Sequence, residues 1–280
     1  MGEHLVTAGD GLELFVRSFG ESGGQTPVVC IPGLTRNSRD FTSLAGALCA
    51  DRLVVAVDLR GRGRSAWDPT ATSYTLDTYA DDVVRVLDEV VGEPAVLLGT
   101  SLGGLTSMWV GADHPDRVRG VVLNDVGPEI DPAGAARIAS YAGKLPPVHD
   151  WDDAVAQTRL VSEGDTPGLT DQQWEAAARQ RYRELPDGTV VVDHDPGVAS
   201  GPGPTRDPWL VFSELADTPM LVLRGATSDI LAASTVAAMA ENHPGLEAVE
   251  IPDRGHVPTL DEPVARAAIV RFLAEVDARS

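Results

Sequence analysis

Ser101 has the sequence surroundings of a catalytic nucleophile. It lies in the pentapeptide Gly99–Gly103 (GTSLG), directly after the apolar run Ala95–Leu98 and before the helix-compatible stretch 102–112. On a sharp turn from a strand into a helix, a serine is held in a strained conformation with its hydroxyl above the sheet edge. Flanking glycines avoid clashes with the neighbouring strand and helix. The pattern therefore predicts that Ser101 is a nucleophile.

A nucleophilic serine needs a general base, and His256 is the best placed of the six histidines. It follows the apolar segment Leu246–Ile251, on a loop from which a side chain can reach a nucleophile at the same edge of a sheet. The other histidines lie near a terminus, before prolines or in the middle section, namely His4, His114, His149, His194 and His243. We therefore predict that His256 takes the proton of Ser101.

The elements that must position these residues alternate between apolar runs and helical patterns, which is typical of βαβ units in a mostly parallel sheet. The expected strands cover residues 12–19, 27–31, 53–57, 95–98, 118–124, 220–224 and 246–251. The expected helices cover residues 74–91, 102–113, 234–242 and 263–278. These elements predict an α/β fold.

The alternation stops near Asp131 and resumes near Pro219. Between them lie three helical patterns, at residues 133–142, 151–161 and 171–184, and a Pro- and Gly-rich stretch at 193–208. We interpret residues 131–212 as a helical cap inserted into a core formed by residues 1–130 and 213–280. A separate helical domain is the alternative, and the position between two core strands favours the cap.

Several segments along the chain share motifs with one known family. They are 30–34 (CIPGL), 58–65 (DLRGRGRS), 99–103 (GTSLG), 224–229 (RGATSD) and 255–256 (GH). With these motifs the chain resembles the α/β-hydrolase superfamily over essentially its full length. The resemblance implies a mostly parallel twisted sheet flanked by helices, with nucleophile, acid and histidine in that order along the chain.

Two aspartates between Ser101 and His256 are candidates for the acid that orients the histidine. Asp229 follows the strand-like segment 219–224 and a short turn, and Asp125 ends the expected strand 118–124. We predict Asp229, because one helix and one strand fit between it and His256. Asp125 is the rival, and otherwise a carboxylate that caps a loop.

The resemblance also implies an oxyanion hole made of two backbone N–H groups. By position they belong to Leu34, after Gly33, and to Leu102, after the nucleophile. Members of the family usually carry histidine where this chain has Pro32. The proline removes a side-chain hydrogen bond under this loop but leaves the N–H of Leu34 as a donor.

Three arginines alternate with glycines in the run Arg60–Ser65, a composition that can indicate phosphate binding. The run follows an expected strand, and Lys144 is the only lysine of the chain, so no Walker-type lysine is present. We interpret the run as a structural loop near the nucleophile.

The composition is strongly acidic, with 42 acidic and 22 basic residues and a net charge of −20. This charge argues against nucleic acids and anionic membranes as partners. The chain has no apolar run long enough for a membrane span, and its first residues lack a signal peptide's apolar core. Cys30 and Cys49 fit small core residues and make no metal motif. We expect a cytoplasmic protein, and its oligomeric state stays open.

These features predict a cofactor-independent serine hydrolase that cleaves a small carboxylic ester or lactone through an acyl-enzyme. Candidate substrate contacts are Trp209, Phe212 and Arg36, although the two aromatic residues can instead anchor the cap and Arg36 can lie on an exposed loop. The alternatives are a C–C bond hydrolase of the meta-cleavage-product type, a cofactor-free lyase, and a ligand receptor on the same scaffold.

Overall fold

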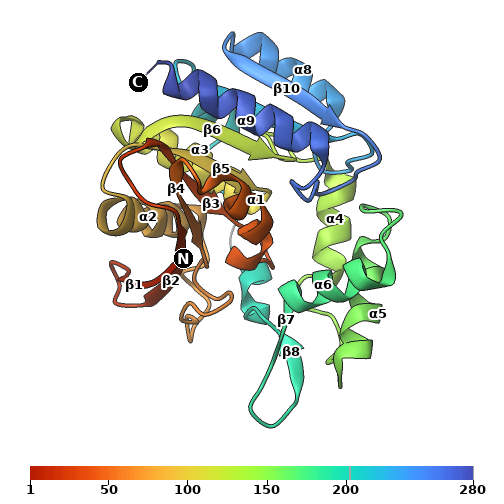
Figure 1. Ribbon diagram of the computed structural model, residues 1–280. Coiled ribbons are helices and arrows are strands. Elements are labelled where there is room, and N and C mark those ends of the chain that lie inside the picture. The colour runs from red at the N-terminus through yellow and green to blue at the C-terminus, as the bar shows by residue number, and fades with distance from the viewer. Residues whose placement is uncertain (202, 280) are drawn as a thin grey trace.

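An eight-stranded sheet forms the centre of the computed structural model, which describes residues 1–201 and 203–279 (Figure 1). The strand order is β1-β2-β4-β3-β5-β6-β9-β10. Strand β2 pairs antiparallel with β1 and β4, and all other neighbours run parallel, which confirms the predicted mostly parallel sheet. The bounds are β1 (Gly2–Thr7), β2 (Glu13–Phe19), β3 (Gln25–Ile31), β4 (Arg52–Val57), β5 (Ala95–Thr100), β6 (Val118–Asn124), β9 (Met220–Gly225) and β10 (Leu246–Ile251).

Helices cover both faces of the sheet because alternate residues of each central strand are buried on opposite sides. In β5, Leu97 packs in the core that includes α2 and α3, whereas Leu98 packs in the core that includes α1 and α9. The helices of this part are α1 (Thr42–Leu48), α2 (Leu76–Val86) with a π-helical extension η2 (Leu87–Val91), α3 (Leu102–Asp113), α8 (Ala233–Asn242) and α9 (Pro263–Asp277). Short 3₁₀ turns are η1 (Ser38–Phe41) and η3 (Pro115–Arg117). Across the described residues, we find no helix that combines the length and apolarity needed to cross a membrane.

Residues 131–212, called the insert below, lie between β6 and β9 and are mostly helical. Figure 1 shows α4, α5, α6 and the β7–β8 hairpin set apart from the large sheet. The elements are α4 (Pro132–Tyr141), α5 (Trp151–Ser162), α6 (Asp171–Arg181), β7 (Tyr182–Glu184), β8 (Val190–Val192), η4 (Pro196–Ser200) and α7 (Pro208–Ser213). Helices α5 and α6 and the hairpin share a small apolar core of their own.

Two strand regions differ from the sequence-based expectation. Strand β1 was not expected, because only Val6 of its six residues is buried and an edge strand of this kind carries little apolar periodicity. The expected helix 171–184 ends at Arg181, and its last three residues form β7. They pair with the valines of β8 across a turn in which Gly188 has a positive φ of 86°.

The arginine- and glycine-rich loop after β4 is held by protein groups. The guanidinium of Arg60 is 1% exposed and bonds the carboxylates of Asp82 and Asp10. Arg62 donates to the carbonyl oxygens of Leu34 and Arg60 and to the hydroxyl of Tyr79. These contacts fit the interpretation of the run as a structural loop.

Replacing Asp82 by Asn should lower the free energy of unfolding by about 3 kcal/mol, because the charge of Arg60 then stays buried without its buried partner. Urea denaturation measures the change. Asp10→Asn is the matched control, since the Asp10 carboxylate is 45% exposed and should contribute less than about 1 kcal/mol. An equal loss in both variants would contradict the assignment of Asp82 as the main partner.

Candidate active site

The turn that carries Ser101 joins β5 to α3 and is strained, as predicted. Ser101 has φ 52° and ψ −116°, a conformation that side-chain-bearing residues rarely adopt. The neighbouring glycines allow close packing: a Cβ on Gly99 would lie 2.2 Å from the carbonyl oxygen of Gly103, and one on Gly103 would lie 2.1 Å from that of Ile31. The turn therefore presents the serine hydroxyl at the carboxyl end of β5.

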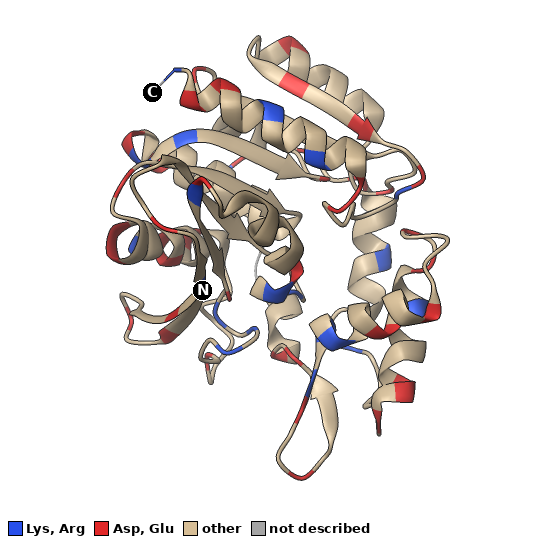
Figure 2. Ribbon diagram, viewed as in Figure 1, with Lys and Arg blue, Asp and Glu red and all other residues tan. Residues whose placement is uncertain are grey.

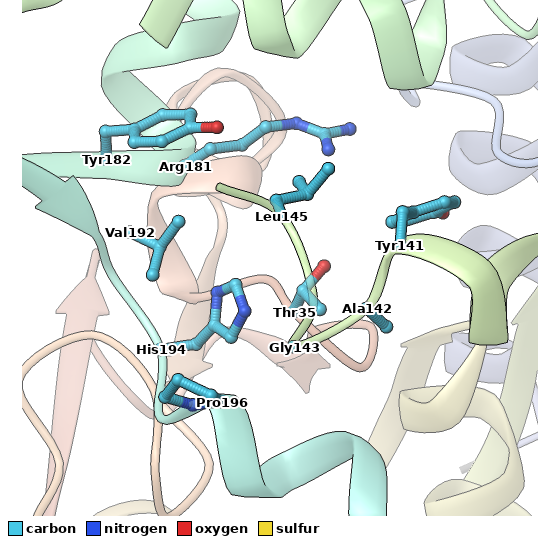
Figure 3. A pocket seen from close by; sticks show the side chains of 10 residues that line it. All are labelled: Thr35, Tyr141, Ala142, Gly143, Leu145, Arg181, Tyr182, Val192, His194 and Pro196. Carbon is cyan, nitrogen blue, oxygen red and sulfur yellow. The ribbon is translucent and has the colours of Figure 1, made fainter. Parts of the chain in front are cut away.

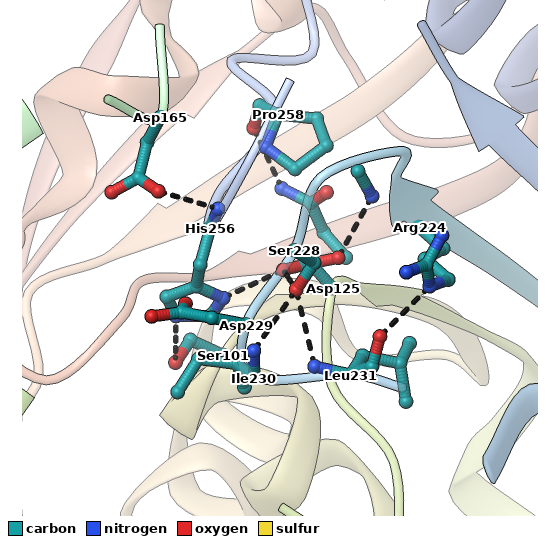
Figure 4. A network of polar contacts seen from close by, with 12 residues as sticks. Ser101, Asp125, Asp165, Arg224, Ser228, Asp229, Ile230, Leu231, His256 and Pro258 are labelled. Atoms are coloured by element: carbon teal, nitrogen blue, oxygen red, sulfur yellow. Dashed lines mark hydrogen bonds and ion pairs between the residues drawn. The ribbon is translucent and has the colours of Figure 1, made fainter. Parts of the chain in front are cut away.

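A line of hydrogen bonds connects Ser101, His256 and Asp125 (Figure 4). The imidazole Nε2 of His256 lies 3.0 Å from Ser101 Oγ, and Nδ1 lies 2.7 Å from Asp125 Oδ2. An ionised carboxylate only accepts hydrogen bonds, so Nδ1 carries the proton and Nε2 is free to accept the serine proton. Both the Asp125 carboxylate and the imidazole are buried.

The predicted pairing of Asp229 with His256 is wrong in this structure, and the rival Asp125 takes its place. Strands β6 and β9 are neighbours, so Asp125 at the end of β6 lies beneath the loop that follows β9. The end of β9 and this loop supply donors: the Gly225 N–H bonds Asp125 Oδ1 at 2.8 Å, and the Ser228 hydroxyl bonds Oδ2 at 2.6 Å. Asp229, the next residue, turns toward the insert instead.

Asp229 belongs to an ion-pair cluster that ties the insert to the histidine loop. Arg137 of α4 binds both oxygens of Asp229, at 2.5 and 2.7 Å, and also reaches Asp165 at 3.1 Å. Asp165 in turn accepts the backbone N–H groups of His256 and Gly255. The Arg137 guanidinium lowers the pKa of Asp229, whereas burial raises the pKa of Asp165. Sequence reasoning missed Arg137 and Asp165, because no local pattern marks contacts between the insert and this loop.

The loop after β3 brings Leu34 beside the nucleophile. A Cβ built on Gly33 would lie 3.7 Å from Ser101 Cβ, so this loop touches the turn. The Leu34 N–H has no hydrogen-bond partner among the described residues, and the Leu102 N–H is the first of α3, where no acceptor exists within the helix. The Leu34 carbonyl accepts from buried Arg62 at 2.9 Å, which anchors the loop that begins with Pro32.

A cavity of about 480 Å³ contains Ser101 and His256. The core contributes residues such as Gly33, Leu34 and Thr100, and the insert contributes Tyr141, Thr158, Ser162, Asp165, Trp174 and Arg181. The insert residues therefore form much of the wall that a substrate would meet.

Of the three predicted substrate contacts, only Arg36 lines this cavity, and its guanidinium is paired with Asp40 at 2.7 and 2.5 Å. The predictions for Trp209 and Phe212 are wrong. Phe212 is buried in the core cluster that includes α3, and its ring contacts that of Trp209 edge-on, with centroids 5.8 Å apart. Both residues anchor the return from the insert to the core, which was the alternative interpretation.

The comparisons with known proteins agree with this architecture. A model of the alpha/beta hydrolase family matches residues 28–269. The chain belongs to the alpha/beta hydrolase family. It is 34% identical to a 3-hydroxybutyrate-oligomer hydrolase of Cupriavidus necator, over 91% of this chain and 90% of that protein.

Two further proteins are similar to this chain over nearly its whole length. A crystal structure of an alpha/beta hydrolase from Novosphingobium aromaticivorans superposes with a TM-score of 0.91 at 40% identity, covering 98% of each chain. A 2-(acetamidomethylene)succinate hydrolase of Mesorhizobium japonicum is 25% identical over 90% of each protein. The named relatives are hydrolases, which supports a hydrolase role for this chain.

His194 lies near the cavity in a positively charged environment. Its side chain is buried, and its Nδ1 has no hydrogen-bond partner among the described residues. Burial lowers the pKa of His194 to about 4, and the nearby charges of Arg62, Arg181 and Arg36 act in the same direction. The imidazole is therefore neutral at pH 7 in the folded protein.

Replacing Asp125 by Asn should lower kcat on an ester such as p-nitrophenyl acetate by about 10⁴-fold, because an amide can hold His256 in the wrong tautomer. Asp229→Asn is the matched control and should cost far less, since Asp229 does not bond the imidazole. Both variants are measured on one ester at one pH. A larger loss in Asp229→Asn would restore Asp229 as the acid.

The buried neutral state of His194 should make stability fall between about pH 6.5 and pH 4. In this range the unfolded chain binds a proton at residue 194 that the folded protein does not, so unfolding becomes easier as the pH falls. His194→Gln should reduce the difference in unfolding free energy between pH 7 and pH 4.5 by about 2–3 kcal/mol. The exposed His149→Gln serves as control. Equal pH dependence in wild type and His194→Gln would contradict the assignment.

Proposed function

We propose that this enzyme hydrolyses a small carboxylic ester through an acyl-enzyme on Ser101. The observation that carries the proposal is the continuous line of hydrogen bonds from the Ser101 hydroxyl through His256 to the buried carboxylate of Asp125. A serine, a base and an orienting acid in this order are the groups that acyl transfer requires.

In the proposed mechanism, His256 Nε2 removes the hydroxyl proton as Ser101 Oγ attacks the acyl carbon. Asp125 keeps the proton on Nδ1 and stabilises the imidazolium that forms. The Gly225 N–H and the Ser228 hydroxyl hold the Asp125 carboxylate, so the imidazole has little freedom to rotate. His256 then donates its new proton to the leaving alcohol, and a water that His256 activates releases the acid from Ser101.

The backbone N–H groups of Leu34 and Leu102 are the proposed donors to the oxyanion. Leu34 borders the cavity, and both N–H groups are free of acceptors within their own elements. Donors of this kind contribute roughly 3–4 kcal/mol each to transition-state stabilisation. Arg62, through the carbonyl of Leu34, keeps the first donor in place.

The substrate class follows from the cavity and from the relatives. A volume of about 480 Å³ suits a small molecule. The relative that covers most of this chain at 34% identity is named for 3-hydroxybutyrate oligomers, whose units are joined by linear esters. We therefore place esters of short hydroxy acids ahead of lactones as substrates.

Ser101→Ala should lower kcat by at least about 10⁴-fold on p-nitrophenyl esters and on the linear 3-hydroxybutyrate dimer, because the nucleophile is lost while the core is untouched. Exposed Ser140→Ala is the control. A fluorophosphonate should label the wild-type enzyme and Ser140→Ala but not Ser101→Ala. Turnover that survives in pure Ser101→Ala would remove Ser101 from the mechanism, and a wild-type protein that neither labels nor turns over esters or lactones would favour a receptor.

A further inference from the structure

Arg181, the last residue of α6, is the one arginine of the insert that forms no ion pair with a carboxylate in the described part of the chain. The other five arginines of the described insert each form an ion pair with an acidic residue, namely Arg137, Arg159, Arg179, Arg183 and Arg206. Arg181 forms none with the residues that the structure describes. In a chain of net charge −20, a half-buried guanidinium left without a counterion is unusual.

Only some of the N–H donors of the Arg181 guanidinium have a hydrogen-bond acceptor among the described residues. One amino group donates to Ser162 Oγ at 2.8 Å, and the buried Nε has no partner among the described residues. Burial lowers the pKa of Arg181 to about 10, so the group still carries its charge at neutral pH. The guanidinium therefore retains positive charge and donor capacity for a ligand.

Arg181 lies where its free donors can reach a ligand in the candidate active site. Arg181 lines the cavity that contains Ser101, and it also lines an adjoining cavity of about 60 Å³. Tyr141 and Thr35 border both cavities. Figure 3 shows the Arg181 side chain extended across the smaller pocket, with its guanidinium on the side of Tyr141.

Acidic residues of the cavity wall do not neutralise Arg181, because each is already paired with another arginine. These pairs are Asp40 with Arg36, Asp165 with Arg137, Asp261 with Arg266 and Glu262 with Arg254. Elsewhere acidic residues are spread over helices and loops of the molecule, as Figure 2 shows. The uncompensated positive charge at Arg181 is thus a local feature of the cavity.

We propose that Arg181 binds a free carboxylate of the substrate, so that the enzyme acts on esters that also carry a carboxylate. The inference rests on the proposed function and names its substrate class. A carboxylate is planar and accepts two parallel N–H bonds from a guanidinium, and the Ser162 hydroxyl can donate a further bond. A single monoanion matches Arg181, which alone among the arginines of the described cavity wall has no carboxylate partner, whereas a phosphate dianion would bring an excess negative charge into the cavity.

The first experiment measures binding without turnover. In the Ser101→Ala background, isothermal titration calorimetry compares the linear 3-hydroxybutyrate dimer, which has a free carboxylate, with its methyl ester. The acid should bind more tightly, and adding Arg181→Met should weaken the acid relative to the ester by about 10- to 100-fold, the contribution of a charged hydrogen bond. Equal binding of acid and ester in the Ser101→Ala protein would overturn the proposal.

The second experiment compares kcat/KM for the same two compounds in wild type, Arg181→Met and Arg181→Lys. The preference for the acid should fall about 10- to 100-fold in Arg181→Met and partly return in Arg181→Lys. Arg179→Met removes an exposed arginine of the same helix and should leave the preference unchanged. An unchanged preference in folded Arg181→Met would overturn the proposal. If the wild-type enzyme hydrolyses neither compound, the result counts against the proposed function. The binding experiment still decides the role of Arg181 in that case.

Discussion

The carboxylate of Asp125 accepts three hydrogen bonds from two segments of the chain: two from Gly225 and Ser228, at the end of β9 and in the loop after it, and one from the His256 ring. It is fully buried at the end of β6, so each of these contacts replaces water that the ionised group has lost. Breaking one of them would leave a buried charge short of a partner. The orientation of His256 toward Ser101 depends on this arrangement.

The insert contacts the loops around Ser101, His256 and Asp125 at several points. Asp165 holds the backbone of the His256 loop, and Arg137 links Asp165 to Asp229. Farther along, Gly63 and Gly61 exchange backbone hydrogen bonds with Asp193 and Asp195. The insert therefore supplies walls of the cavity and also restrains the histidine loop, so changes in the insert can affect both substrate choice and catalytic geometry.

Arginine performs three different tasks in this acidic protein. Arg60 stabilises the loop after β4 through Asp82, and Arg62 fixes the backbone of the proposed oxyanion loop. Arg181 pairs with no carboxylate of the described residues and lines the cavity. A guanidinium suits all three roles because it keeps its charge when buried and donates in several directions.

Much of the site is local in sequence, and this explains what could be predicted from the chain alone. The Ser101 turn depends on glycines within two or three residues of it, and the βαβ pattern places its hydroxyl at the carboxyl end of the sheet, where the His256 loop also lies. Short apolar runs likewise predicted seven of the eight strands of the large sheet, and the exposed edge strand β1 lacks such a run.

Only the tertiary structure decided which acid pairs with His256 and which side chains line the cavity, because both depend on contacts between segments far apart in the sequence. Asp125 and Asp229 both follow strands, and only the adjacency of β6 and β9 puts the first beside His256 and leaves the second to Arg137. Trp209 and Phe212 suited a pocket by residue type, yet they pack against α3 because the chain re-enters the core there. The sequence likewise does not show that Arg181 lacks a carboxylate partner among the described residues, because its contacts depend on how the insert folds over the sheet.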